Sequence, residues 1–142
     1  AFAAAVVTRH LVACGDDGGS GQPDAAIDAP TGTPDAAPRQ TVMEGKDILS
    51  NQLVEGTLAG GPGDVAVITL MAPQPQLDWN LHGHAGGSTQ VVKEELGVMS
   101  VSYTFSPTAQ ADWFLLLRNK HTATMTVQVK LELYGNITWS GW

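Results

Sequence analysis

Short segments of apolar or alternating residues recur along the second half of the chain, and they predict β-strands. Val65–Met71 is β-branched and apolar, and it follows the turn sequence Gly60-Gly-Pro-Gly-Asp64. From Leu77 to His84, apolar and polar residues alternate, so an extended strand would place the two kinds on opposite faces. Further strands are predicted at residues 98–105, 113–118 and 122–134, with a short one at 90–92.

Residues 46–58 allow two interpretations. The spacing of Ile48, Leu49, Leu53 and Val54 suits a short helix, whereas Leu53–Leu58 could equally form the first strand of a hairpin. In either case the pattern contains six to eight short strands and no long helix. This predicts an all-β domain over residues 39–142, a single antiparallel β-sandwich of jelly-roll or immunoglobulin-like kind.

Residues 15–38 differ in composition from the rest of the chain. They consist largely of Gly, Pro, Asp, Ala, Thr and Ser, and the sequence Pro-Asp-Ala-Ala occurs at 23–26 and again at 34–37. Such a segment buries too little apolar surface to offset the entropy of ordering it. We therefore expect a disordered tether, extended by repulsion between its aspartates.

The first 14 residues end in a motif. An apolar run is followed by Leu11-Val12-Ala13-Cys14, which resembles the lipobox of bacterial lipoprotein precursors. The resemblance implies a signal-like segment over residues 1–14, a lipid on Cys14, attachment to a membrane through that lipid, and a periplasmic or cell-surface location. A short buried helix with a core cysteine is the alternative.

Four segments of the predicted sandwich carry a second resemblance. Residues 77–84 (Leu-Asp-Trp-Asn-Leu-His-Gly-His), 103–107 (Tyr-Thr-Phe-Ser-Pro), 111–119 (Ala-Asp-Trp-Phe-Leu-Leu-Leu-Arg-Asn) and 126–133 together resemble a GOLD-type domain, as in the emp24/p24 proteins. The chain also resembles, less closely, the prepeptidase C-terminal domains of secreted bacterial enzymes. Both resemblances imply a non-catalytic interaction module and carry over no catalytic residues.

The charge of the chain excludes one class of partner. Among 142 residues there are 14 acids and 7 bases, a net charge of −7. Residues 15–38 contribute −5, residues 39–142 contribute −3, and Arg9 contributes +1. A nucleic-acid partner would require a basic face, so none is expected. Because Cys14 is the only cysteine, an intrachain disulfide and a cysteine-based zinc site are also excluded.

His82 and His84 are the sharpest candidates for chemistry. In a strand, residues two apart point to the same side, so both imidazoles could converge on one ion. Imidazole suits Cu and Zn. Glu94 and Glu95 follow the next turn and could add a ligand from the neighbouring strand, with His121 as a more distant option. Alternatively, the histidines lie on a solvated face without a metal.

The four tryptophans form the second candidate set. Trp79 and Trp113 lie in apolar strand segments and are expected in the core. Trp139 and Trp142, near the end of the sequence, are candidates for binding a ligand or partner, including sugar rings, or they could plug an open end of the sandwich.

Motifs typical of enzymes, such as Gly-x-Ser-x-Gly or His-Glu-x-x-His, do not occur in the sequence. We therefore expect a non-enzymatic, lipid-anchored module without a resident cofactor, which binds an envelope protein or self-assembles. A Cu- or Zn-binding protein and a carbohydrate-binding module are the alternatives.

Overall fold

The computed structural model describes residues 34–85 and 87–142, and these form two packed antiparallel sheets. The strands in chain order are β1 (Gln40–Ile48), β2 (Leu53–Gly60), β3 (Val65–Met71), β4 (Leu77–Ala85), β5 (Ser88–Val98), β6 (Ser100–Phe105), β7 (Ala111–Asn119), β8 (Met125–Tyr134) and β9 (Thr138–Trp139). We call the four-stranded sheet, with order β1-β8-β3-β6, sheet A. The five-stranded sheet, with order β5-β4-β7-β2-β9, is sheet B.

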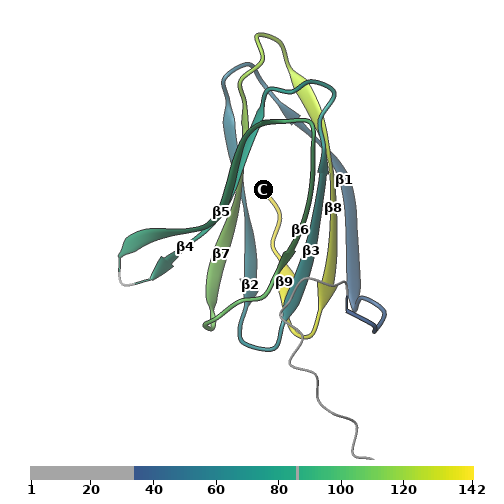
Figure 1. Cartoon of the computed structure of the whole chain (residues 1–142), viewed down its shortest axis with the longest axis vertical. Helices are drawn as coiled ribbons and strands as arrows, with labels where there is room; N and C mark the ends of the chain where they lie inside the picture. The colour runs from purple at the N-terminus through teal and green to yellow at the C-terminus, as the bar shows by residue number, and fades with distance from the viewer. Residues whose placement is uncertain (1–33, 86) are drawn as a thin grey trace, which may run out of the picture.

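The connections between strands produce a jelly roll. Most consecutive strands lie in different sheets, so the chain crosses repeatedly from one to the other, and only the β4–β5 hairpin stays within one sheet among β1 to β8. Figure 1 shows the two sheets facing each other and the β4–β5 hairpin extending away from the body of the sandwich. The predicted all-β antiparallel sandwich is confirmed.

The core lies between the sheets and is built by strand alternation. On β8, every second residue from Met125 to Leu133 is buried, as the alternating pattern predicted. On β7, Trp113, Leu115 and Leu117 point inward. The largest side chain that is fully enclosed is Trp79, which packs beside Tyr103 of sheet A at a ring distance of 5.8 Å.

Residues 46–58 form strands rather than a helix. β1 ends at Ile48, a turn spans residues 49–52, and β2 begins at Leu53. The helix interpretation was therefore wrong. Residues 53–58 do form a strand, but not the first strand of a hairpin, because β2 lies in sheet B and β3 in sheet A. The buried side chain of Asn119 fixes this end of the sandwich, because its Nδ2 donates to the carbonyl oxygens of Ile48 (2.9 Å) and Ala123 (2.8 Å).

β1 and β5 extend furthest beyond what the pattern predicted. β1 begins at Gln40, although its inward positions include the charged residues Glu44 and Lys46. The indole of Trp142 covers these positions: its Nε1 donates to Glu44 Oε1 at 2.5 Å, and Lys46 Nζ lies 5.5 Å from its ring. The short strand predicted at 90–92 is the middle of β5, which spans 11 residues.

Asp64 ties together two turns at the other end of the sandwich. Its buried carboxylate accepts hydrogen bonds from the backbone N–H groups of Gly61 (2.9 Å) and Asn136 (2.6 Å). These bonds stabilise the charged form, so they hold the pKa of Asp64 below its usual value of 3.8, with a further small contribution from Arg39.

The predictions for the signal-like segment 1–14, for Cys14 and for most of the tether fall outside the described residues. Within the described part, residues 34–39 form no strand, and β1 follows directly. None of the elements described there is a helix of the length and apolarity needed to span a membrane.

Candidate functional site on the outer face of sheet B

Strand alternation places a mixed set of polar and apolar side chains on the outer face of sheet B, which points away from the core. The set is Leu53 and Glu55 on β2; Asp78, Asn80, His82 and His84 on β4; Val91, Glu94 and Leu96 on β5; and Asp112, Phe114, Leu116 and Arg118 on β7. As the sequence predicted, both histidines lie on the face opposite the apolar residues of β4.

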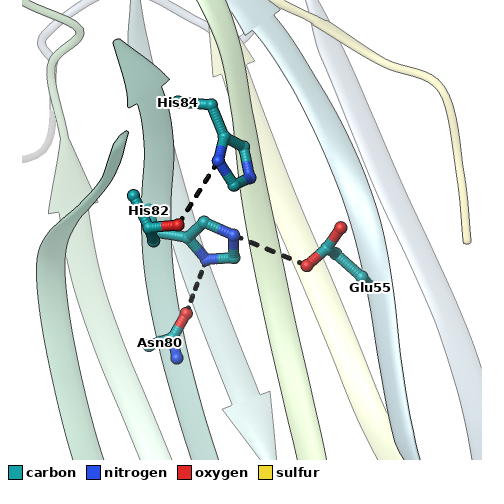
Figure 2. Close-up of polar contacts among 5 residues, drawn as sticks. Glu55, Asn80, His82 and His84 are labelled. Atoms are coloured by element: carbon teal, nitrogen blue, oxygen red, sulfur yellow. Dashed lines mark hydrogen bonds and ion pairs between the residues drawn. The ribbon is translucent and has the colours of Figure 1, made fainter. Parts of the chain in front are cut away.

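His82 is the centre of a packed cluster on this face. Although it points away from the core, only 5% of its surface is exposed. The Phe114 ring stacks on it at 5.5 Å with an interplanar angle of 26°, and the His84 ring meets it edge-on at 5.1 Å. Asn80 and Glu55 flank the two nitrogens of His82, as Figure 2 shows. The imidazole is thus held in one orientation by four neighbours.

The two nitrogens of His82 have different partners. Nδ1 lies 2.8 Å from Asn80 Oδ1, and Nε2 lies 3.5 Å from Glu55 Oε2. In the tautomer that carries its proton on Nδ1, this N–H donates to Asn80 Oδ1, and the lone pair of Nε2 faces the Glu55 carboxylate. Nε2 and Oε2 together can therefore hold one cation, either a proton or a metal ion.

Burial dominates the protonation of His82. Desolvation disfavours the charged imidazolium and lowers the pKa of His82 below its usual value of 6.5. The Glu55 carboxylate acts in the opposite direction and raises the pKa, while His84 lowers it slightly. The lowered pKa favours the neutral imidazole, which is the form that can bind a metal ion.

The glutamates expected to join the histidines are arranged differently. Both lie on β5, the strand next to β4, but Glu94 is opposite Asn80 rather than a histidine. Glu95 is opposite Trp79 and points to the inner side, where it accepts a hydrogen bond from Trp79 Nε1 at 3.0 Å. This bond, together with Lys93, lowers the pKa of Glu95.

His121 lies in the loop after β7, where its Nδ1 accepts a hydrogen bond from the Ala123 N–H. In the part of the chain that the structure describes, no group of three or more His, Cys, Asp or Glu side chains is placed to hold a metal ion. The metal site remains a prediction, with His82 and His84 together and Glu94, Glu95 and His121 elsewhere.

Sequence reasoning missed Glu55 and Phe114. Glu55 is opposite Leu116 and Phe114 is opposite His82, because sheet B has the order β4-β7-β2. Neither is close to the histidines in sequence, so only the strand order could have identified them. The local pattern predicted which face of β4 the histidines occupy, but it did not predict which residues of other strands lie beside them.

A groove continues the outer face of sheet B beyond Asn80. It has a volume of about 210 Å³, and its lining includes Leu53, Asp78, Glu94, Leu96, Leu116 and Arg118. Leu53 and Leu96 are 50% and 68% exposed, and Val91 nearby on β5 is 55% exposed. The groove thus combines large exposed apolar side chains with carboxylates.

A second hollow lies on the outer face of sheet A. It has a volume of about 320 Å³ and is lined mainly by Met43, Met71, Thr69, Gln128 and Lys130. Met43 and Met71 are 75% and 60% exposed. Among its lining residues the only charged ones are Glu44 and Lys130, and it has no ionisable side chain that is buried.

Trp139 and Trp142 lie at the edge of the sandwich between β1 and β2. Their rings meet edge-on at 5.1 Å, and both pack partly buried against the core. The Trp139 ring occupies the space above Gly56, where a Cβ atom would lie 2.0 Å from it. The two rings therefore cover the edge of the core between β1 and β2. Their role in binding a ligand or partner stays a prediction.

The sequence matches no family model and no curated protein. Among solved structures, the chain is similar to a mitogen derived from Yersinia pseudotuberculosis, with 13% identity and a TM-score of 0.50 over 70% of this chain and 88% of that one. It is also similar to PliG of Aeromonas hydrophila, a periplasmic inhibitor of g-type lysozyme, with 9% identity and a TM-score of 0.48 over 72% and 91%. At these identities, the likeness to the mitogen supports the sandwich fold, and neither likeness assigns a function.

Proposed function

We propose that the chain is a non-enzymatic interaction module of the cell envelope, held at a membrane by a lipid on Cys14, which binds a protein partner through the outer face of sheet B. The anchor and the location rest on the lipobox resemblance of residues 11–14. The binding role rests on the composition of the outer face.

One observation carries the binding role: large apolar side chains remain exposed on a face that also holds a packed, partly polar cluster. Leu53, Val91 and Leu96 are each at least half exposed, and Phe114 and Leu116 lie half-buried between them. Protein interfaces commonly combine an apolar centre with aromatic side chains and polar surroundings. A partner that covered this face would bury these apolar side chains together with the cluster around His82.

Site-specific photocrosslinking of the full chain tests this proposal. A photoreactive residue is placed at Leu96 on the outer face of sheet B or, as the matched control, at Met43 on the outer face of sheet A. The chain is then exposed to an envelope fraction of cells that produce it. We expect a defined crosslinked protein from position 96 and none from position 43.

The mass of the product separates the two forms of the proposal. A product of twice the chain's mass means self-assembly, and any other defined mass means a separate partner. Equal crosslinking from positions 96 and 43, or a product from 43 alone, contradicts a role for the outer face of sheet B.

A metal site is the second candidate function, and the arrangement around His82 favours it. Nε2 and Glu55 Oε2 are 3.5 Å apart, which suits two ligands of one Zn or Cu ion at metal–ligand distances of about 2.0–2.2 Å. A histidine that ligates a metal commonly donates its other N–H to an oxygen, and Asn80 Oδ1, 2.8 Å from Nδ1, is placed to accept such a bond. A third ligand would have to come from His84, whose ring lies edge-on beside His82, after a change of its orientation, because the described residues contain no preformed group of three ligands.

Titration calorimetry with Zn²⁺ and with Cu²⁺ tests the metal site, together with elemental analysis after purification without chelators. Binding should be lost in His82→Gln and weakened about 10-fold or more in Glu55→Gln, as for loss of a ligand or its support. Glu94→Gln is the control, because Glu94 is not opposite a histidine. Absence of both metals and of calorimetric binding would rule this candidate out.

A further inference from the structure

The charges of the domain are distributed very unevenly. Residues 39–142 contain nine acids and six bases, a net charge of −3. Four of the acids and only one of the bases lie on the outer face of sheet B: Glu55, Asp78, Glu94, Asp112 and Arg118. The net charge of this face is therefore −3. The remaining five acids and five bases cancel.

Elsewhere, several charges are already paired. Lys93 and Glu95 form an ion pair at 3.0 Å, and so do Lys130 and Glu132. On the outer face of sheet B, by contrast, Glu55 faces only the buried His82, and the described part of the chain contains no ion pair of Glu94 or Arg118. The unbalanced charge of the domain is thus presented on one surface.

From this distribution we infer that the partner of the outer face of sheet B is a protein with a basic, partly apolar surface. The inference deepens the function proposed above and rests on it. An acidic partner would meet four carboxylates and a single guanidinium, and repulsion between like charges across an interface is costly. A basic partner would be attracted over a distance of about one Debye length.

The groove fits the side chains that such a partner would offer. Lys and Arg have an apolar stem that can lie along exposed leucines and a charged head that remains near carboxylates. Here Leu53 and Leu96 line the same groove as Asp78 and Glu94. Asp78 also accepts the Gly97 N–H at 2.9 Å, which fixes its carboxylate in place. The hollow on sheet A has two exposed methionines but no such pair of carboxylates.

Titration of the ¹⁵N-labelled full chain with short model peptides, followed by NMR, tests the inference. One peptide alternates leucine with arginine, a second alternates leucine with glutamate, and a third alternates serine with arginine. We expect the leucine–arginine peptide to shift amide signals of β2, β4, β5 and β7 and to bind at least several-fold more tightly than the other two. Raising the salt concentration from about 0.05 to about 0.5 M should weaken this binding several-fold, because the Debye length shortens.

Two double variants test whether binding depends on where the carboxylates lie or only on the net charge of the chain. Asp78→Asn with Glu94→Gln removes two carboxylates from the groove, and we expect it to weaken binding about 10-fold. Asp47→Asn with Glu132→Gln makes the same change in charge on the outer face of sheet A, and the affinity should stay within about twofold. Both variants keep the acidic segment 15–38, so its charge cancels in the comparison.

The outcomes separate the inference from the function on which it rests. If the leucine–glutamate peptide shifts the signals of this face and the leucine–arginine peptide does not, the face docks a partner of another charge, and the inference alone fails. If no peptide shifts these signals, both fail. If the two double variants weaken binding equally, attraction is due to net charge alone, and the inference is overturned.

Discussion

The two outer faces of the sandwich have the same architecture and very different chemistry. On sheet A, exposed Met43 and Met71 line a hollow with Thr69 and Gln128, and Lys130 forms an ion pair with Glu132. On sheet B, exposed leucines stand among four carboxylates, and an imidazole is buried beneath its neighbours. Since both sheets bury their inner faces in one core, the fold itself does not require this difference.

The buried imidazole makes the contrast sharper. Burying an ionisable group lowers stability unless its polar atoms find partners, and sheet A shows that an outer face can do without one. His82 nevertheless lies buried between Phe114 and His84, with a lowered pKa. Ionisable groups with shifted pKa values are enriched at functional sites, which supports a function for the outer face of sheet B.

The largest expected effect comes from removing the centre of the cluster. His82→Ala deletes a side chain that is 5% exposed, so we expect the free energy of unfolding to fall by about 2–3 kcal/mol. Met71→Ala, at a position 60% exposed on sheet A, should change it by about 0.5 kcal/mol or less. Urea unfolding in the presence of EDTA measures both. An equal decrease in the free energy of unfolding for both variants would mean that the two outer faces are packed alike.

Sequence periodicity correctly predicted on which face of a strand a residue lies, but it did not predict which residues of the neighbouring strands lie beside it. The alternation from Leu77 to His84 correctly placed both histidines opposite the buried residues, because side chains in a strand have a period of two. The turn after His84 correctly predicted that Glu94 and Glu95 lie on the next strand. Irregular pairing between β4 and β5 then determines which residue faces which, and no local pattern encodes it.

Long-range contacts explain the other failures. β1 did not look like a strand because Glu44 and Lys46 occupy inward positions, and these are covered by Trp142, which lies about a hundred residues later. Glu55 reaches His82 only because β7 separates β4 from β2 in sheet B. The fold class could thus be predicted from the sequence, but the composition of the site depends on strand order.

The next effect is smaller and concerns how the free energy of unfolding depends on pH. It distinguishes a carboxylate that stabilises the fold from carboxylates that are exposed to a partner. The pKa of Asp64 is lowered, so its contribution to stability is present above its unfolded value of about 3.8 and is lost as pH falls through the lower folded value. Asp64→Asn should lower the free energy of unfolding by about 1–2 kcal/mol at pH 7 and by less at about pH 3.

Asp112→Asn with Glu94→Gln on the outer face of sheet B is the control for Asp64. We expect these substitutions to leave the acid dependence of stability close to that of the unchanged chain. Urea unfolding between about pH 7 and about pH 3 measures it. A loss of acid dependence in the control, but not in Asp64→Asn, would show that the face holds the fold together and is not reserved for a partner.

The smallest expected effect concerns the exposed leucines, and it tests whether the groove needs apolar contact as well as charge. Leu96→Ser removes a side chain that is 68% exposed, so the free energy of unfolding should change by about 0.5 kcal/mol or less. Affinity for the leucine–arginine peptide should nevertheless fall several-fold, because an apolar contact in the interface is lost. Met43→Ser, 75% exposed on sheet A, should alter neither quantity. If Leu96→Ser leaves the affinity unchanged, the two faces differ in charge alone, and the groove does not need an apolar contact to bind the peptide.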